Sequence, residues 1–283
     1  MNNIQIIFDT MNDVASGIIE KYDNIEMLPV SIVLDGKEYK AGVDITGDEF
    51  YTLLRNSNEI PKTSQITYTT FKETFEKYLS QGKKVLYMAG SSNASGTYQS
   101  SMLAKNDIEN NEDIYIFDTY NLSIGGGMLI AEAAEMIEQG LDIKEILNKL
   151  EEYKDKVEVY FSVDTLDYLH KGGRISSTTA TVGSLLSIKP ILKLDDGMVK
   201  SKDKVRGTKK IVPALIKHLR EECGDLSDKC VYVGYGDDVD GLNKFIEIVK
   251  NELNPKEIKV FQIGPCVACH SGPDVVGIGA LNK

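Results

Sequence analysis

Short apolar runs and amphipathic stretches alternate along the first half of the chain. A short run bounded by turn residues is typical of a buried strand, whereas apolar residues that recur every three or four positions predict a helix. The strand-like segments are Ile4–Phe8, Met27–Leu34, Lys37–Lys40, Val85–Met88 and Asp113–Phe117. Asp35-Gly36 joins two of them and is a strong hairpin signal. Strands that alternate with helices in this way predict a parallel sheet covered by helices.

Helical spacing fills most of the intervals between these strands. Thr46 is a candidate N-cap before a helix that carries Phe50, Leu53 and Leu54. Gly82 is a candidate C-terminal stop for the next helix. A run of three glycines, residues 125–127, precedes another helix. The further helical segments are predicted at Val14–Ile19, at Phe71–Leu79, from a start within Ser95–Ser101, at Ala131–Ile137 and at Ile143–Tyr153.

The pattern changes in the second half of the chain. It opens with the strand-like Val157–Val163 and a short helical segment, and Asp195-Asp196-Gly197 then gives a second hairpin signal. The other predicted elements are strands at Ile188–Leu194, Met198–Lys204 and Val275–Leu281 and helices at Thr208–Cys223 and Asp240–Asn251. We therefore predict an α/β protein of two domains. Residues 1–155 would hold a parallel sheet, and residues 156–283 would form an α+β domain with a mixed sheet. Clefts between such domains are common ligand sites.

The composition is that of an ordinary globular protein, with 42% hydrophobic and 27% charged residues. The formal net charge of -11 would repel polyphosphate backbones, so we expect no nucleic-acid partner. No apolar segment approaches the ~20 residues of a membrane span, and the N-terminal sequence lacks the features of a secretory signal. The 4 cysteines do not form a disulfide framework in a chain of this length. These properties predict a reduced, cytoplasmic protein with no stable membrane insertion.

The segment Cys266-Val267-Ala268-Cys269-His270 matches the pattern for covalent haem attachment. Such attachment belongs to an oxidising compartment, and no export signal is present. A structural zinc site would require two more ligands at a compact spacing, which Cys223 and Cys230 do not offer. The favoured interpretation is a loop packed by two small apolar cysteines, so we predict no metal.

Hydroxyl side chains gather at residues 91–97, in the sequence Ser-Ser-Asn-Ala-Ser-Gly-Thr, between an apolar strand and a predicted helix. Free N–H groups and the helix dipole favour an anion at a helix start, but the same serines can serve only as a cap. Composition supports both interpretations equally. The segment is not a Walker loop, and no such loop occurs elsewhere, so we predict no cofactor. A second cluster, Thr63-Ser64-Gln65, is on its own typical of a loop.

Two further features leave alternatives open. Lys171-Gly172-Gly173-Arg174 can be a basic loop for phosphate or a protein partner, or a solvated turn after a helix. His270 stands between two glycine-rich turns, where packing does not require an imidazole. Paired with Ser92 or Ser95 it would suit a hydrolase, but the chain has no Gly-x-Ser-x-Gly elbow.

Taken together, these segments resemble the DegV family, the fatty-acid-binding subunits of bacterial fatty acid kinase. The resemblance runs nearly from end to end and keeps several long motifs in order. The matching segments are Pro29–Thr46 (PVSIVLDGKEYKAGVDIT), Thr63–Gln65, Ser91–Ser100 (SSNASGTYQS), Phe161–Ile175, Gly183–Pro190, Lys204–Lys210 and Ile263–Pro273 (IGPCVACHSGP). The resemblance implies two α/β domains with an acyl chain buried between or within them.

The resemblance also implies a site. The carboxylate of a long-chain fatty acid would be bound by hydroxyls, by N–H groups at a helix start and by a nearby histidine, while a basic surface loop would face phosphate or the kinase. The implied ligand-binding residues are Thr63, Ser95, Ser92 and His270, and the implied partner-facing residues are Arg174 and Lys171. The chain would be a carrier without catalytic residues, and an ATP-dependent fatty acid kinase subunit would be its partner.

The sequence departs from the family pattern at three places. Asp9-Thr10 stands where an Asp-Ser-Thr-like turn is usual, Ala94 replaces an apolar Leu, and Cys266 and Cys269 replace aliphatic or small hydroxyl residues. Chain-length preference therefore cannot be carried over. Two rival hypotheses are an enzyme acting on a small carbonyl or phosphorylated substrate, with His270 as nucleophile or base, and a regulatory domain with a filled interior.

Overall fold

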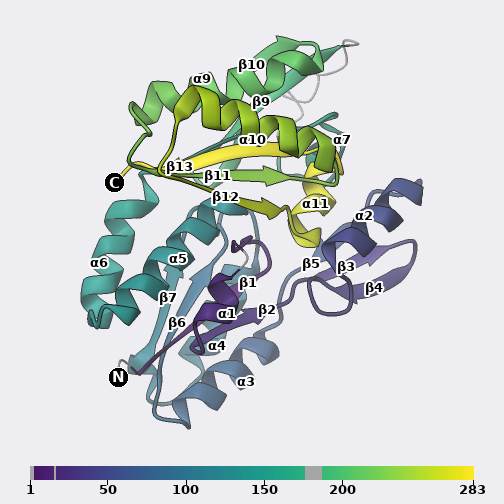
Figure 1. Cartoon of the computed structure of the whole chain (residues 1–283). Helices are drawn as coiled ribbons and strands as arrows, with labels where there is room; N and C mark the ends of the chain where they lie inside the picture. The colour runs from purple at the N-terminus through teal and green to yellow at the C-terminus, as the bar shows by residue number, and fades with distance from the viewer. Residues whose placement is uncertain (1–2, 16, 176–186) are drawn as a thin grey trace.

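The computed structural model describes residues 3–15, 17–175 and 187–283, which form three sheets and the helices around them (Figure 1). The first sheet is parallel, with strand order β2-β1-β6-β7. Its strands are β1 (Ile4–Asp9), β2 (Ile25–Leu28), β6 (Lys84–Ala89) and β7 (Ile114–Asp118). Every residue of β1 is buried, as a strand covered on both faces requires.

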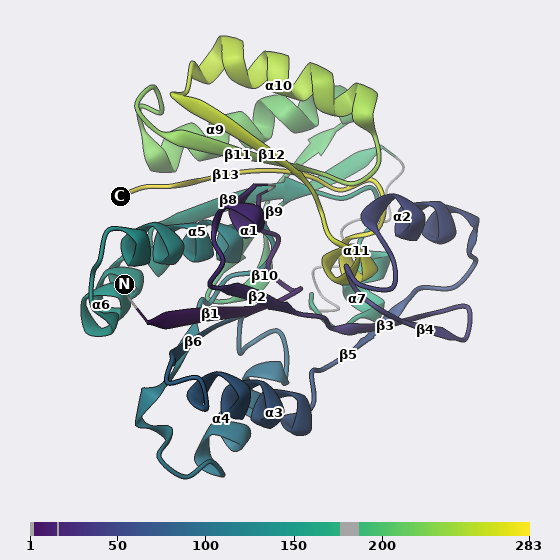
Figure 2. The same ribbon diagram turned by 60° about the horizontal axis from the view of Figure 1, so that its bottom comes forward.

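Helix pairs cover the two faces of this sheet (Figure 2). One pair is α3 (Tyr68–Leu79) with α4 (Thr97–Asn106), and the other is α5 (Ile124–Glu138) with α6 (Ile143–Lys154). The alternation of apolar runs and helical spacing thus predicted the helix-covered parallel sheet correctly. Within the described residues, none of the helices has the length and apolar character that crossing a membrane requires.

A small antiparallel sheet of order β4-β3-β5 stands beside the first one. It consists of β3 (Ser31–Leu34), β4 (Lys37–Lys40) and β5 (Lys62–Ser64), and α2 (Gly47–Asn56) lies next to it. The predicted hairpin at Asp35-Gly36 is confirmed, with positive φ at both residues. The predicted single strand over residues 27–34 is wrong. Pro29 has no N–H to donate to a ladder, and the chain there leaves β2 for the small sheet.

The third sheet is mixed and has the order β10-β9-β8-β13-β11-β12. Its strands are β8 (Val157–Ser162), β9 (Ile188–Asp195), β10 (Met198–Arg206), β11 (Cys230–Tyr235), β12 (Glu257–Gln262) and β13 (Val276–Leu281). Among the neighbouring strand pairs of this sheet in the described residues, β11 and β12 are parallel and the others are antiparallel. The outer face is covered by α9 (Ile211–Cys223), which follows a 3-10 turn at Thr208–Lys210, and by α10 (Val239–Leu253). The predicted fold class is confirmed.

Helix α5 is the shared layer between the two large sheets, because it packs on β1 and β6 on one side and on β8 and β13 on the other. The chain passes from the first large sheet to the second between Lys154 and Val157. We propose the division into domains after residue 155 on this basis. The two domains would then share one continuous apolar cluster around α5.

Three local predictions need correction. The helix expected near Val14 is only α1 (Ile18–Lys21). The glycines at 125–127 lie inside the first turn of α5 and do not precede it. Glycine is required at 127, because a Cβ atom there would lie 2.0 Å from the carbonyl oxygen of Asp13 in the loop that packs on this turn. The cysteine segment is not a loop but α11 (Pro265–Ser271), with proline in its first turn and Gly272 directly after it.

Candidate functional site

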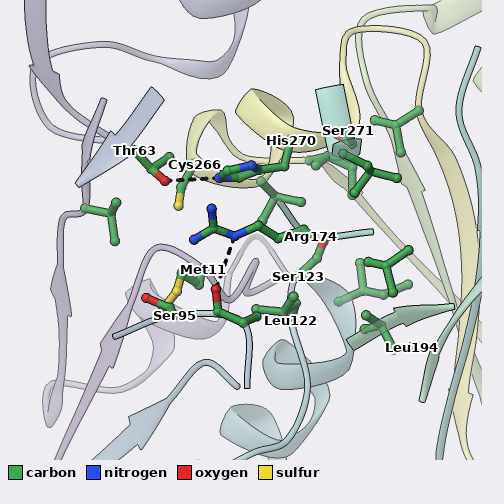
Figure 3. Close-up of a pocket in the computed structure, with 18 of the residues that line it drawn as sticks. Met11, Thr63, Ser95, Leu122, Ser123, Arg174, Leu194, Cys266, His270 and Ser271 are labelled. Atoms are coloured by element: carbon green, nitrogen blue, oxygen red, sulfur yellow. Dashed lines mark hydrogen bonds between the residues drawn. The ribbon is translucent and has the colours of Figure 1, made fainter. Parts of the chain in front are cut away.

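A cavity of about 390 Å³ lies where the loops of the first sheet meet the inner face of the mixed sheet (Figure 3). Its lining falls into two groups that come from different elements. The polar group comes from loops, β5, the start of α4 and α11, and comprises Thr63, Ser64, Gln65, Ser95, Thr97, Ser123, Arg174, His270 and Ser271. The apolar wall is formed by residues on strands of the mixed sheet or directly beside them, namely Val159, Phe161, Leu194, Val199, Ile263 and Val275. Further apolar lining residues, among them Met11, Val30, Leu122 and Ile124, come from the first half of the chain.

The position of the polar end follows from the strand order of the parallel sheet. β2 lies on one side of β1 and β6 on the other, so the loops that leave the carboxyl ends of β1 and β6 diverge. Ligands of open α/β sheets bind in the crevice that opens at such a switch point. Met11 from the first loop and Ser95 from the second both line the cavity.

Ser95 is held at the start of α4. Its Oγ accepts a hydrogen bond from the N–H of Thr97 at 3.2 Å and donates to Thr97 Oγ1 at 3.1 Å. Thr97 is fully buried, and its Oγ1 also accepts the N–H of Ile66 at 3.3 Å. Thr97 thereby fixes the Ser95 loop against the segment that follows β5. Thr97 belonged to the predicted hydroxyl cluster, but we did not predict its role as the link between the two hydroxyl segments.

Thr63 lies on β5 and meets His270 on α11. The Oγ1 of Thr63 and the Nε2 of His270 are 3.0 Å apart (Figure 3). The expectation that Thr63 sits in a simple loop is therefore wrong: pairing of β5 with β3 fixes it in a strand, opposite Ile32. A three-residue strand is too short for an alternation of polar and apolar residues to indicate it.

The imidazole of His270 is neutral. Burial, together with the positive charge of Arg174, lowers its pKa to about 4. Among the described residues, its Nδ1 atom is buried without a hydrogen-bond partner. A proton on Nδ1 would leave a buried donor unpaired, so the favoured tautomer carries the proton on Nε2. In that tautomer His270 donates to Thr63, and the Thr63 hydroxyl keeps its own proton for a ligand.

Arg174 lies inside the mouth of the cavity rather than on an outward-facing surface loop, which corrects our expectation. It follows α7 (Asp167–Lys171), and its Nε donates to the carbonyl oxygen of Ala94 at 3.2 Å, while Nη1 donates to the carbonyl oxygen of Gly172. In the view of Figure 3 its guanidinium lies between the Thr63–His270 pair and Ser95. The side chain turns inward because the carbonyl next to Ser95 accepts from it.

Comparisons with known proteins agree with this architecture. A family model described as "Uncharacterised protein, DegV family" matches residues 3–283. A DegV domain-containing protein of Caldanaerobacter subterraneus is 35% identical over 278 residues, which cover 98% of each chain.

This chain belongs to the DegV family.

Solved structures of DegV proteins superpose closely on this one. A DegV lipid-binding protein of Thermotoga maritima is 32% identical, with a TM-score of 0.88 and coverage of 99% of this chain and 98% of that one. A second Thermotoga maritima protein, described as revealing a fatty acid binding function, is 30% identical with a TM-score of 0.87 and 99% coverage of both chains. A stearic acid-binding protein of Eubacterium ventriosum is 28% identical, with a TM-score of 0.86 and coverage of 100% and 99%. Fatty acid binding is thus described for several members of the family.

Two residues that the DegV resemblance placed at the site do not line the cavity. The backbone N–H of Ser92 donates to Asp118 Oδ1 at 3.2 Å at the end of β7, whereas Ser95, three residues on, reaches the cavity. Lys171 is exposed at the end of α7. Of the matching segment Gly183–Pro190, residues 183–186 lie outside the described part of the chain.

The orientation of α11, which carries His270, depends on Asp13. One carboxylate oxygen of Asp13 accepts the N–H of Gly264, just before α11, at 2.9 Å, and the other accepts the hydroxyl of Ser123 at 2.5 Å. Burial raises the pKa of Asp13 to about 6, although both hydrogen bonds favour the ionised form. Ser123 lines the cavity, so this carboxylate joins the loop after β1, the start of α5 and α11 around it. Sequence reasoning missed this group.

Cys266 and Cys269 are buried on α11, and Cys266 lines the cavity. Burial raises the pKa of both thiols well above the usual value, so both are protonated and unreactive. Across the residues that the structure describes, no group of three or more potential metal ligands gathers at one place. The cysteines act as small apolar side chains at the edge of the mouth.

Proposed function

We propose that this protein binds a long-chain fatty acid, with the carboxylate between Thr63 and Ser95 and the acyl chain along the apolar wall. The observation that carries the proposal is the division of one cavity into a mouth with hydroxyls and a guanidinium and a wall of aliphatic and aromatic side chains. A buried carboxylate has to be paired, and the mouth offers neutral and cationic donors. The fatty acids described for related DegV proteins support the same ligand class.

The energies suit tight but reversible binding. Burial of a methylene contributes ~0.8 kcal/mol, so roughly fifteen methylenes give about 12 kcal/mol. The loss of translational and rotational freedom on association opposes this with ~4–15 kcal/mol. The net affinity therefore depends on how well the mouth pairs the carboxylate.

The hydrogen bond between His270 and Thr63 determines which way the Thr63 hydroxyl points. A neutral ring that donates from Nε2 to Thr63 Oγ1 turns the threonine hydroxyl toward the ligand. Ser95 has the complementary freedom, because its proton can turn from Thr97 to the carboxylate while its oxygen still caps the helix. Arg174 would then neutralise the charge of the carboxylate to which these hydroxyls donate.

The test is to denature the purified protein and weigh what it releases. We expect a straight-chain acid of ~14–18 carbons in near-stoichiometric amount, as the size of the cavity suggests. Release of no lipid, also after incubation with free fatty acids, would refute the proposal. The same measurement separates the carrier from an enzyme that uses His270 on a small carbonyl or phosphorylated substrate, since the enzyme would not retain a lipid.

We further propose that the bound carboxylate is presented to a separate ATP-dependent kinase, which forms the acyl phosphate. The mouth holds donors but no Walker loop is found in the sequence, so the phosphoryl donor would have to come from a partner. Arg174 inside the mouth can meet the transferred phosphoryl group, and the exposed Lys171 on the same turn can meet the partner.

This second proposal is tested with Lys171→Ala in a reaction that contains the fatty acid kinase and ATP. Acyl phosphate output should fall while the amount of retained fatty acid stays the same. The exposed Lys144→Ala, on α6 and away from the mouth, is the matched control. Output equal to the wild type with Lys171→Ala, at limiting kinase, would remove Lys171 from the interface.

A further inference from the structure

The face of β13 that borders the cavity carries two glycines. Gly277 lines the cavity, and side chains two apart on a strand point to the same face, so Gly279 shares this face. In the register of β13 with β8, Gly277 stands opposite Phe161 and Gly279 stands opposite Val159. The strand therefore offers a bare backbone floor over two successive positions.

The two glycines differ in what covers them. A Cβ atom at Gly279 would lie 2.8 Å from Met128 Cε and 3.1 Å from Val159 Cγ2, so the end of the Met128 side chain packs directly on this glycine. At Gly277 the three nearest atoms, at 3.2 to 3.9 Å, all belong to the neighbouring strand β8. Gly277 therefore borders the cavity, whereas Gly279 is covered by the side chain of Met128.

Met128 lies on α5, is only 1% exposed and does not line the cavity. Its thioether therefore occupies the place where the bare floor of β13 would otherwise continue the cavity. Methionine has three rotatable bonds and fills irregular gaps, so it makes an adjustable end rather than a rigid one. The polar residues Thr63 and Ser95 come from other elements, so with the head group at the mouth the glycines of β13 are candidates for the place where the acyl chain ends.

We infer that Gly277 and Met128 together set the length of the acyl chain, with Gly277 as the last open position and Met128 as the stop. This inference rests on the proposed fatty acid binding and deepens it. A side chain added at Gly277 would fill the space that the last methylenes occupy. Removal of the Met128 side chain would uncover Gly279 and lengthen the cavity along the same strand.

The experiment uses the full chain, stripped of lipid and incubated with an equimolar mixture of saturated straight-chain acids of ~12 to ~20 carbons, followed by mass analysis of the acids retained. Gly277→Val should shift the retained distribution toward shorter acids by ~2 carbons, since valine adds three heavy atoms. Met128→Ala should shift it toward longer acids by a similar amount. The milder Gly277→Ala should shift it less in the same direction as Gly277→Val, and it tests the position if valine prevents folding.

Met136→Ala is the matched control, because Met136 is also a buried methionine on α5 but, unlike Met128, is not among the nearest neighbours of Gly277 or Gly279. It should lose stability as Met128→Ala does and keep the wild-type length distribution. Wild-type distributions in both Gly277→Ala and Met128→Ala, or shifts opposite to those expected, would overturn the inference while fatty acid binding stands. A wild-type protein that retains no acid would instead refute the proposed function itself.

Discussion

The two ends of the cavity are built in different ways. The mouth is assembled from segments that are far apart in sequence, since Thr63 and His270 are separated by 207 positions, and it is held by single hydrogen bonds. The wall is the continuous face of β8, β9, β10 and β13, whose backbone ladders fix the apolar side chains at regular spacing. A few hydrogen-bonding atoms thus determine the geometry of the mouth, whereas side-chain packing over a whole surface determines the shape of the wall.

This difference predicts two kinds of variant. When one partner at the mouth is lost, another polar atom remains buried without a partner, and that raises the free energy of the complex. When a wall residue changes size, the shape of the space changes, and the protein selects a different ligand at a similar affinity. Mouth variants should therefore alter how tightly the acid is held, and wall variants should alter which acid is held.

The largest effect is expected from loss of both hydroxyls at the mouth. Thr63→Ala and Ser95→Ala should each weaken fatty acid binding by about 1–3 kcal/mol, because each would leave a buried carboxylate oxygen short of a donor. The double variant should lose ~4 kcal/mol, or roughly a thousandfold in Kd. Displacement of a fluorescent fatty acid would measure these losses.

Ser92→Ala is the matched control, because Ser92 lies in the same loop but does not line the cavity. It should bind as the wild type does. If Ser92→Ala weakened binding as much as Ser95→Ala, or if the double variant kept the wild-type Kd, the head group would not lie where we place it.

A smaller effect concerns pH and His270. The pKa of this histidine is lowered to about 4 in the folded protein from about 6.5, so the unfolded chain binds its proton first as the pH falls. His270 therefore makes the folded protein lose stability between pH 6.5 and pH 4, by at most about 3 kcal/mol at the acid end. His270→Gln keeps an amide donor near Thr63 but cannot titrate, so it should abolish this part of the acid sensitivity.

Urea unfolding at several pH values between 4 and 7 would measure the difference between His270→Gln and the wild type. Ser92→Ala, which changes no titrating group, serves as the control and should keep the wild-type slope. A wild-type slope in His270→Gln as well would mean that the imidazole is not held neutral, and the donor assigned to Thr63 would lose its support.

The sequence predicted the wall far better than the mouth. The apolar runs at β8, β9 and β13 and the glycine turn between β9 and β10 indicate their elements locally, because burial and turn geometry act on neighbouring residues. Only the resemblance to DegV proteins placed Thr63 and Ser95 at the same predicted site. In the structure, their proximity depends on Thr97, which forms hydrogen bonds both with Ser95 and with Ile66 beyond β5. Such a tertiary contact leaves no local pattern in the sequence.

The elements that were missed had weak or misleading signals. Helix α11 has seven residues, too few for a clear helical periodicity, and Pro265 and Gly272, which mark its ends, flank a haem-like cysteine pattern. The inward turn of Arg174 is decided by an acceptor, the carbonyl of Ala94, that lies 80 positions away in sequence. A loop sequence does not indicate which way such a side chain points.

The smallest effect is expected from Arg55, which ties α2 to the mixed sheet outside the cavity. Its guanidinium pairs with Asp237 at 2.6 Å and with Asp274 at 2.8 Å, but the side chain is 43% exposed. Solvent screens such pairs, so Arg55→Ala should lower the free energy of unfolding by only about 0.5–1 kcal/mol. The buried hydroxyl of Tyr51, which donates to the carbonyl of Ile263 at 2.9 Å, should keep α2 in place.

Fatty acid retention should therefore be unchanged in Arg55→Ala, and added salt should narrow the stability difference from the wild type. Tyr51→Phe is the informative counterpart, because it removes the buried hydrogen bond on the same helix and leaves the ion pair intact. The two variants would be compared by measuring both the amount of fatty acid retained and the free energy of unfolding in urea. A loss of bound acid in Arg55→Ala would show that the mouth depends on this surface ion pair, and the distinction between a mouth held by a few hydrogen bonds and a packed wall would then fail.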